Sequence, residues 1–244
     1  MKNMNIFCGL FIAYNIATNT KRELEMKKLF ILLSFLFTTA SNAALIQHIQ
    51  NGDFETGDFT GWTNVNTGSG LWNINDGSFP INGGFVSLSP ISGSFDAVTT
   101  QTGPGFHNLY QEVTLSAFDS AIFSWDDRIR TNSQLSDPNQ EWRVLVQNVN
   151  GSLISELFST NPGDAGIQTG PNSRSYDLTA LLTPLIGQTV RFSFEQQDNA
   201  GFFSASLDNV SFTTEVIQAS APLTGTIFGL GLMGLMLTRK RKLV

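Results

Sequence analysis

The chain has 244 residues, a formal net charge of −6, one cysteine and two histidines. The only cysteine is Cys8, so the chain has no internal disulfide, and beyond residue 8 it offers no thiol chemistry. Residues 44–221 contain five arginines, no lysine and 18 acidic residues, a formal net charge of −13. A region this acidic repels phosphate backbones, which excludes nucleic acid as a partner and is compatible with divalent cations or neutral glycans.

The N-terminal segment predicts a secretory signal that begins inside the printed sequence. Residues 26–43 carry two lysines, then an apolar stretch, and end in the small-x-small pattern Ser41-Asn42-Ala43. This is the pattern of a signal peptide cleaved after Ala43. We therefore interpret residues 1–25 as a mis-assigned start, and a genuine N-terminal extension is the alternative.

Residues 44–214 predict a single all-β domain. Large apolar residues alternate with polar ones in several stretches, which places them on one face of a pleated strand. The clearest stretches are 109–115, 121–125, 142–146, 192–194 and 210–212. Asn150-Gly151 predicts a hairpin turn between strands 142–148 and 153–158, and residues 178–185 predict a short helical turn. Short strands at this spacing indicate a β-sandwich.

The four tryptophans divide by their sequence context. Trp125 and Trp142 lie in alternating strands and are expected to fill the core, whereas Trp62 is expected to pack behind the loop that opens the domain. Trp72 follows two nearby glycines in Gly68-Ser-Gly-Leu-Trp-Asn73. We expect Trp72 to be the exposed one and to stack on a sugar face as a ligand-binding residue.

Catalytic motifs are weak. The two histidines, His48 and His107, are too few for a histidine-based zinc site, and no Gly-x-Ser-x-Gly elbow occurs. Carboxylates that could form a glycosidase pair stand near arginines, which favours ion pairing over catalysis. These carboxylates are Asp126, Asp127, Glu141 and Glu195, and the arginines are Arg128 and Arg130. We expect no enzymatic activity; a secreted hydrolase is the alternative.

The C-terminal segment carries the most distinct motif. Residues 215–222 read as a linker that ends in Ser220-Ala221-Pro222, and residues 223–238 are uncharged and rich in glycine and leucine. The cluster Arg239-Lys240-Arg241-Lys242 follows, within residues 239–244. An apolar helix followed by cations is typical of a membrane anchor whose basic end stays in the cytoplasm.

This layout resembles the PEP-CTERM sorting tail of exported proteins of Gram-negative bacteria, although only the final proline of the signature, Pro222, is kept. The resemblance implies export across the inner membrane, a transmembrane or sorting helix at 223–238 and recognition by a sorting transpeptidase of the exosortase type. The protein would then be membrane-anchored, on the cell surface or secreted. An ordinary C-terminal membrane anchor is the alternative.

Two further motifs stand at the ends of the predicted domain. The opening motif is Asn51-Gly-Asp-Phe-Glu55 with Gly57-x-x-x-Gly-Trp62, and the closing motif is Leu207-Asp-Asn-Val210. Together they resemble the galactose-binding-like jelly-roll domains, a group that includes many carbohydrate-binding modules. The resemblance implies that the first and last strands lie side by side.

The same resemblance implies a structural calcium site formed by Asp53, Glu55 and Asp208. Calcium takes six to eight oxygen ligands, and these carboxylates would supply the anionic ones. The alternative is that Asp53 and Glu55 cap turns and Asp208 accepts backbone hydrogen bonds.

These features predict an exported, non-catalytic cell-surface or extracellular-matrix protein that interacts with exopolysaccharide. The link to the matrix comes from the family context of the tail. A carbohydrate-binding module with a defined glycan ligand is the alternative that the residues leave open.

Overall fold

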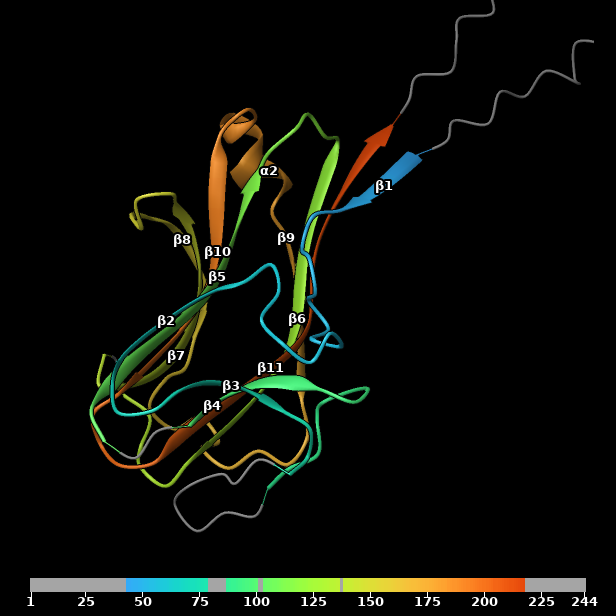
Figure 1. Cartoon of the computed structure of the whole chain (residues 1–244). Helices are drawn as coiled ribbons and strands as arrows, with labels where there is room; N and C mark the ends of the chain where they lie inside the picture. The colour runs from blue at the N-terminus through green and yellow to red at the C-terminus, as the bar shows by residue number, and fades with distance from the viewer. Residues whose placement is uncertain (1–42, 79–86, 101–102, 137, 218–244) are drawn as a thin grey trace, which may run out of the picture. The chain divides into compact units, whose positions relative to one another are not determined.

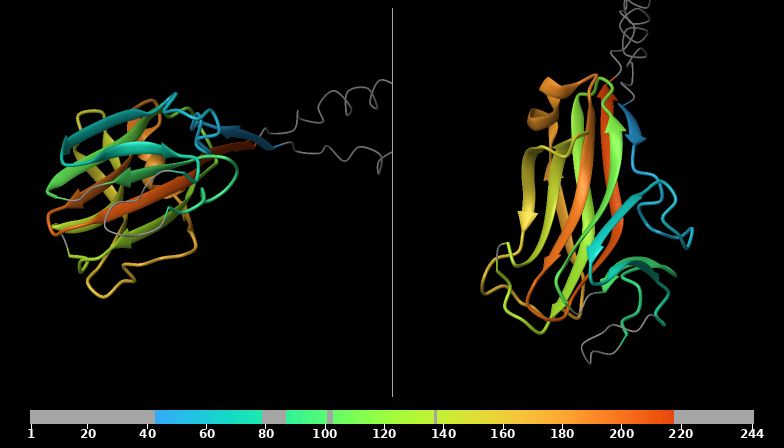
Figure 2. Two further views of the ribbon diagram at one scale, coloured as in Figure 1. Left: turned by 60° about the horizontal axis from the view of Figure 1, so that its bottom comes forward. Right: turned by 60° about the vertical axis from the view of Figure 1, so that its left-hand side comes forward.

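The computed structural model describes residues 43–78, 87–100, 103–136 and 138–217 (Figure 1). This part of the chain forms two antiparallel sheets that face each other, so the predicted β-sandwich is confirmed (Figure 2). The first sheet has the order β3 (Leu71–Asn75), β4 (Asp96–Thr100), β11 (Phe203–Ile217), β6 (Ser120–Thr131) and β9 (Asn172–Asp177), with β1 (Ala43–Gln47) also paired to β11. The second sheet has the order β2 (Thr63–Gly68), β5 (Gly105–Thr114), β10 (Thr189–Asp198), β7 (Gln140–Asn148) and β8 (Leu153–Ser159).

The alternating apolar residues build the core between the sheets. Phe192 and Phe194 of β10 and Phe123 and Phe212 of the first sheet are fully buried, and the rings of Phe123 and Phe192 stack with centroids 4.4 Å apart. Each ring in such a pair removes a large apolar area from water. The core therefore holds the sandwich together without a disulfide.

The predicted turns are confirmed. Gly151 has a φ of 85°, and its N–H donates to the carbonyl oxygen of Asn148, which closes the hairpin between β7 and β8. The predicted helical turn is α2 (Thr179–Leu182) followed by the 3₁₀ helix η1 (Thr183–Leu185). Both turns join strands at the positions that the sequence indicated.

The first and last strands lie side by side, as the jelly-roll resemblance implied. β1 runs antiparallel to the end of β11, with register from Ala43 opposite Ile217 to Gln47 opposite Thr213. β11 therefore continues to Ile217, three residues past the predicted domain end at Thr214. The predicted linker at 215–222 begins inside this strand, because β1 supplies hydrogen-bond partners for its last residues.

The predictions for the two ends of the chain fall outside the described residues. These are the signal peptide up to residue 42, the sorting motif at 220–222, the apolar helix at 223–238 and the cations at 239–242, whereas Ala43, the last residue of the predicted signal, begins β1. Within the described ranges, neither of the short helices is long and apolar enough to cross a membrane.

Candidate functional site

The opening and closing motifs meet at one junction. The N–H of Val210 donates to the carbonyl oxygen of Gly52 at 2.8 Å, and the indole N–H of Trp62 donates to the carbonyl oxygen of Asn51 at 2.9 Å. A Cβ atom at Gly52 would overlap the carbonyl oxygen of Val210. Asn209 has a φ of 51° at the bulge that shifts the register of β11 on β6. The two motifs are thus explained by a close contact between backbones.

The three carboxylates proposed as calcium ligands have hydrogen-bond partners at this junction. Oε1 of Glu55 accepts the N–H groups of Ser94 (2.8 Å) and Phe95 (3.1 Å), and Oδ2 of Asp208 accepts the N–H and hydroxyl of Ser92, both at 2.9 Å. Oδ1 of Asp53 accepts the N–H of Glu55 at 3.4 Å. Glu55 and Asp208 therefore tie the loop around residues 91–95 to the opening loop and to β11.

This placement does not gather the three side chains into a metal site. Among the residues that the structure describes, no group of three histidine, cysteine, aspartate or glutamate side chains could hold a metal ion. The geometry fits the alternative, in which the carboxylates accept hydrogen bonds in turns. Calcium binding stays a prediction that a direct test must decide.

Burial sets the electrostatics of the same junction. Burial raises the pKa of Asp208 to about 6 and that of Asp96 to about 7, because desolvation disfavours a charged carboxylate. Arg128 lies 3.5 Å from Asp96 and partly offsets this effect. Asp96 also accepts the N–H of Ile91 at 3.0 Å, so a second carboxylate holds the same loop.

The prediction that Trp72 is exposed is wrong. Only 1% of Trp72 is exposed, and its ring lies 5.9 Å from that of Trp142 between the sheets. The glycines before it suggested a loop, but Trp72 lies in β3, which pairs with β4 and turns this side chain inward. It therefore offers no surface for stacking on a sugar. Trp62, Trp125 and Trp142 are buried as predicted.

The outer face of the five-stranded sheet carries an array of polar side chains. Because paired residues in antiparallel strands point to the same side, the register identifies the residues opposite the core. The array at the centre of this face consists of Asn108 on β5, Arg143 and Gln147 on β7, and Ser193 and Glu195 on β10. We call these five residues the polar face. In Figure 1, β5, β8 and β10 lie to the left of β1, β6 and β9.

Glu195 is the centre of the polar face. Its Oε2 accepts from Nε of Arg143 at 2.7 Å, and its Oε1 accepts from Nε2 of Gln147 at 3.1 Å and Nδ2 of Asn108 at 3.3 Å. The hydroxyl of Ser193 donates to Oδ1 of Asn108 at 2.7 Å. These hydrogen bonds connect the five side chains of the polar face to one another.

One atom of the polar face lacks a partner. Gln147 is 7% exposed, and its Oε1 makes no hydrogen bond within the described part of the chain. Buried side-chain oxygens are almost always paired, and an unpaired one costs roughly 1–3 kcal/mol. Oε1 of Gln147 has almost no accessible surface, so a donor from outside the protein reaches it only when the amide turns toward solvent.

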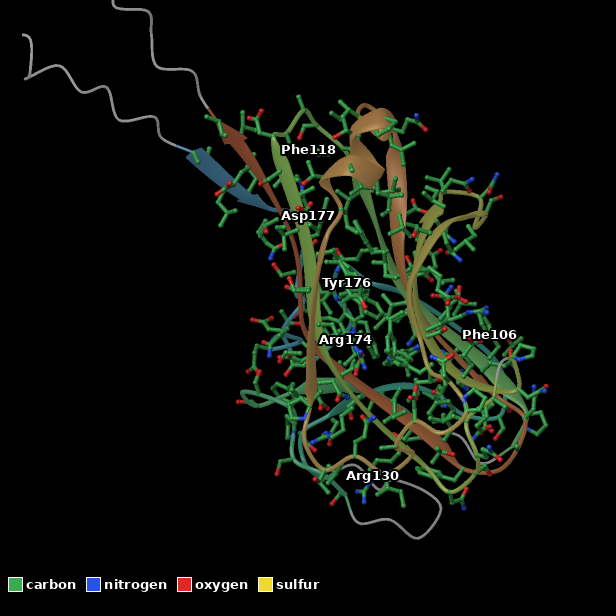
Figure 3. The ribbon with its side chains drawn as sticks, turned by 180° about the vertical axis from the view of Figure 1, so that it is seen from behind. Phe106, Phe118, Arg130, Arg174, Tyr176 and Asp177 are labelled. Atoms are coloured by element: carbon green, nitrogen blue, oxygen red, sulfur yellow. The ribbon has the colours of Figure 1, made fainter. Side chains whose placement is uncertain are left out.

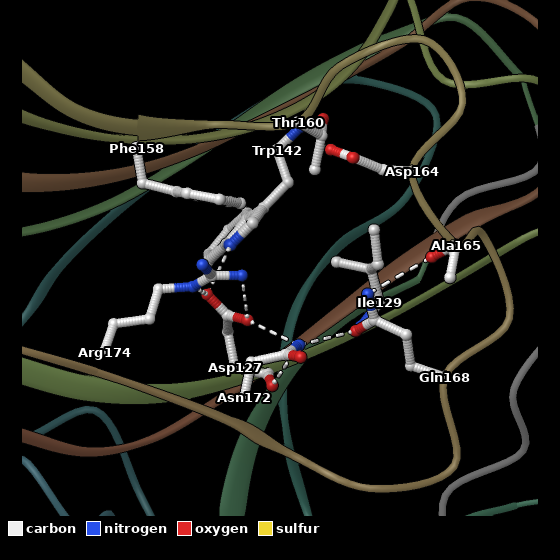
Figure 4. A pocket seen from close by; sticks show the side chains of 10 residues that line it. All are labelled: Asp127, Ile129, Trp142, Phe158, Thr160, Asp164, Ala165, Gln168, Asn172 and Arg174. Carbon is white, nitrogen blue, oxygen red and sulfur yellow. Dashed lines mark hydrogen bonds and ion pairs between the residues drawn. The ribbon is translucent and has the colours of Figure 1, made fainter.

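A second candidate site is a cavity of about 300 Å³ that opens between β6 and β9 on one side and β7 and β8 on the other (Figure 4). We call it the edge pocket. Its floor is Asp127, whose carboxylate accepts from Nε (2.6 Å) and Nη2 (3.1 Å) of Arg174 and from the indole N–H groups of Trp125 (2.8 Å) and Trp142 (3.3 Å). Figure 3 shows Arg174 and Tyr176 along β9.

The residues that could have served catalysis are held in ion pairs and hydrogen bonds. Asp127 pairs with Arg174, and Glu141 and Glu195 pair with Arg143, so the partners are not the predicted Arg128 and Arg130. Arg128 pairs with Asp96, and Asp126 accepts from Nδ2 of Asn209 at 2.8 Å. His107 is fully buried and contacts Oδ1 of Asn66 and the carbonyl oxygen of Ser69. Burial also lowers the pKa of His107.

No family model matches the chain, and no curated protein matches it. Among solved structures, it is similar to TmCBM61 in complex with β-1,4-galactotriose, with 14% identity and a TM-score of 0.44 over 68% of this chain and 97% of that one. It is also similar to a cyclase from Fischerella sp. TAU, with 15% identity and a TM-score of 0.46 over 72% of this chain and 100% of that one.

A third similar structure is the enzymatically active domain of tailspike protein 4 of bacteriophage CBA120, with 12% identity and a TM-score of 0.44 over 68% of this chain. This chain spans only 21% of the tailspike chain. The similar structures thus include carbohydrate-binding modules and enzymes. The function has to be argued from the residues of this chain.

Proposed function

We propose that residues 43–217 form a non-catalytic binding module for a neutral glycan, which lies on the polar face. The observation that carries this proposal is the unpaired Oε1 of Gln147 inside an otherwise hydrogen-bonded array. When the amide of Gln147 turns toward solvent, a sugar hydroxyl can donate to its Oε1 and accept from a neighbouring side chain.

The charge of the protein supports a neutral ligand. Residues 44–221 carry a net charge of −13, and on the polar face Arg143 lies between two glutamates, Glu141 and Glu195. An acidic polysaccharide would meet repulsion from both sources. A neutral chain of sugar residues meets neither.

The test is calorimetric titration of the full-chain protein with neutral oligosaccharides selected on a glycan array. Gln147→Leu keeps a similar volume and removes the unpaired acceptor, so we expect affinity to fall about tenfold or more. The melting temperature should change little, because Arg143, Asn108 and Ser193 still surround Glu195.

Gln188→Leu is the matched control. Gln188 is exposed in the turn before β10, and this variant should bind as the wild type does. Equal affinity of the Gln147→Leu variant and the wild type would contradict the proposal. So would a glycan array without any bound neutral glycan.

We further propose that this module belongs to an exported protein that contacts extracellular polysaccharide and is processed at residues 220–222 by an exosortase-type transpeptidase. The sequence of the two ends supports this proposal. Intact-mass measurement of the protein from its native cells tests both ends at once. A mass that corresponds to the unprocessed chain would contradict it.

A further inference from the structure

We propose that the edge pocket is a second glycan site, which takes one neutral sugar residue at the end of a chain. The proposal shares its ligand class with the proposed function and rests on it in that respect. The cavity of about 300 Å³ lies at the small end of the range for ligand pockets. It therefore has room for a single ring and not for a run of sugar residues.

The edge pocket and the polar face lie on opposite sides of the five-stranded sheet. Trp142 and Arg143 are consecutive in β7, so their side chains point to opposite faces. Trp142 lines the edge pocket, whereas Arg143 belongs to the polar face. One ligand cannot fill both sites, because the sheet separates them.

The edge pocket combines apolar walls with polar groups, as recognition of a sugar requires. Ile129, Trp142 and Phe158 form the apolar part, and the ring of Phe158 lies 3.5 Å below the guanidinium carbon of Arg174. Sugar rings present apolar C–H faces that pack on such surfaces. The pocket thus offers burial in addition to hydrogen bonds.

The polar groups of the pocket include both a donor and an acceptor. Arg174 uses Nε and Nη2 to hold Asp127, which leaves its Nη1 without a hydrogen bond to the described residues. Asp164, on the exposed loop after β8, also lines the pocket, and its Oδ2 accepts the N–H of Asn161 at 2.7 Å. A hydroxyl group can satisfy a guanidinium donor and a carboxylate acceptor in turn.

The charges in the edge pocket favour a neutral residue over an acidic one. Asp127 balances the charge of Arg174, so Asp164 leaves the pocket with a net negative charge. A uronic acid or a sulfated sugar would be repelled. With one site for the end of a chain and another on the far side of the sheet, the module can bridge two glycan chains, which raises the avidity for a glycan network.

The test uses the full-chain protein and free glucose, galactose and mannose at millimolar concentrations, with saturation-transfer NMR as the readout. At least one of these monosaccharides should bind the wild type and the Gln147→Leu variant equally. Asp164→Ala removes the acceptor and should weaken that binding about tenfold or more. Ala165→Trp fills the pocket from an exposed position and should abolish it.

Asp177→Ala is the matched control, because Asp177 also accepts a backbone N–H in a turn, that of Thr179 at 2.9 Å, and does not line the pocket. It should bind as the wild type does. The proposal is overturned if no monosaccharide binds the wild type. It is also overturned if binding survives both pocket variants, or if it disappears in the Gln147→Leu variant, which would assign it to the polar face. Failure of oligosaccharide titration alone would overturn only the proposed function.

Discussion

The junction of the opening and closing motifs and the polar face are both polar and built from distant parts of the chain, but they differ in which groups make the hydrogen bonds. At the junction, backbone N–H groups meet Glu55 and Asp208, and the backbones of Gly52 and Val210 bond each other. On the polar face, the side chains bond each other and leave Oε1 of Gln147 unpaired. The comparison teaches that the conspicuous motifs serve folding, whereas the glycan site proposed above is built from dispersed residues that form no motif.

The largest effect is expected from a substitution that disrupts the junction and leaves the polar face unchanged. Gly52→Ala places a Cβ atom against the carbonyl oxygen of Val210. We expect a loss of about 3 kcal/mol in the free energy of unfolding, since an overpacked site must shift its backbone. Urea denaturation measures this loss in the free energy of unfolding.

Gly170→Ala is the control for this variant, because a Cβ atom there meets nothing within 4 Å and should cost less than about 0.5 kcal/mol. If the polar face is independent of the junction, the folded Gly52→Ala protein binds oligosaccharide with wild-type affinity. A loss of affinity equal to that of the Gln147→Leu variant would show that the two regions act as one.

The pH dependence of stability tests the buried carboxyls of the junction. The pKa of Asp96 in the folded protein is about 7, above its ordinary value of 3.8. The folded state therefore binds the proton more tightly than the unfolded state, and this stabilisation is present at low pH and is lost as pH rises through about 7.

Between about pH 5 and about pH 8, the Asp96 carboxyl should lower the free energy of unfolding by about 2 kcal/mol. Asp208, with a pKa of about 6, acts in the same direction. Asp96→Asn cannot titrate, so the melting temperature of this variant should fall less across the same range. An identical pH slope in the two proteins would refute this assignment.

The smallest expected effect concerns calcium. If Asp53, Glu55 and Asp208 act only as hydrogen-bond acceptors, the melting temperature is the same with calcium and with chelator. Calorimetric scans with calcium and with chelator measure the two melting temperatures. A higher melting temperature in calcium would instead support the calcium site that the jelly-roll resemblance implied, and would make the junction a binding site too.

The sequence predicted the sandwich well because its signals are local. Alternation along β7 and β10, the Asn150-Gly151 turn and the helical turn near Leu182 depend only on neighbouring residues. The extension of β11 to Ile217 was missed because it depends on pairing with β1, far away in the chain.

The candidate site was harder to predict for the same reason. Asn108, Gln147 and Glu195 come together only through the register of three strands. Alternation shows that Arg143 and Gln147 share a face of β7, and this signal could have identified them as a polar stripe. It does not reveal that Oε1 of Gln147 is buried and unpaired. Trp72 was misjudged because no local pattern reports that β3 joins the first sheet.

The placement of β11 has a mechanical consequence. This strand is 15 residues long and is bonded to β6 along one side and to β4 and β1 along the other. Any tension applied through the residue that follows Ile217 enters the domain along the axis of this inner strand. Its hydrogen bonds with β6 then share the load in shear instead of opening one after another.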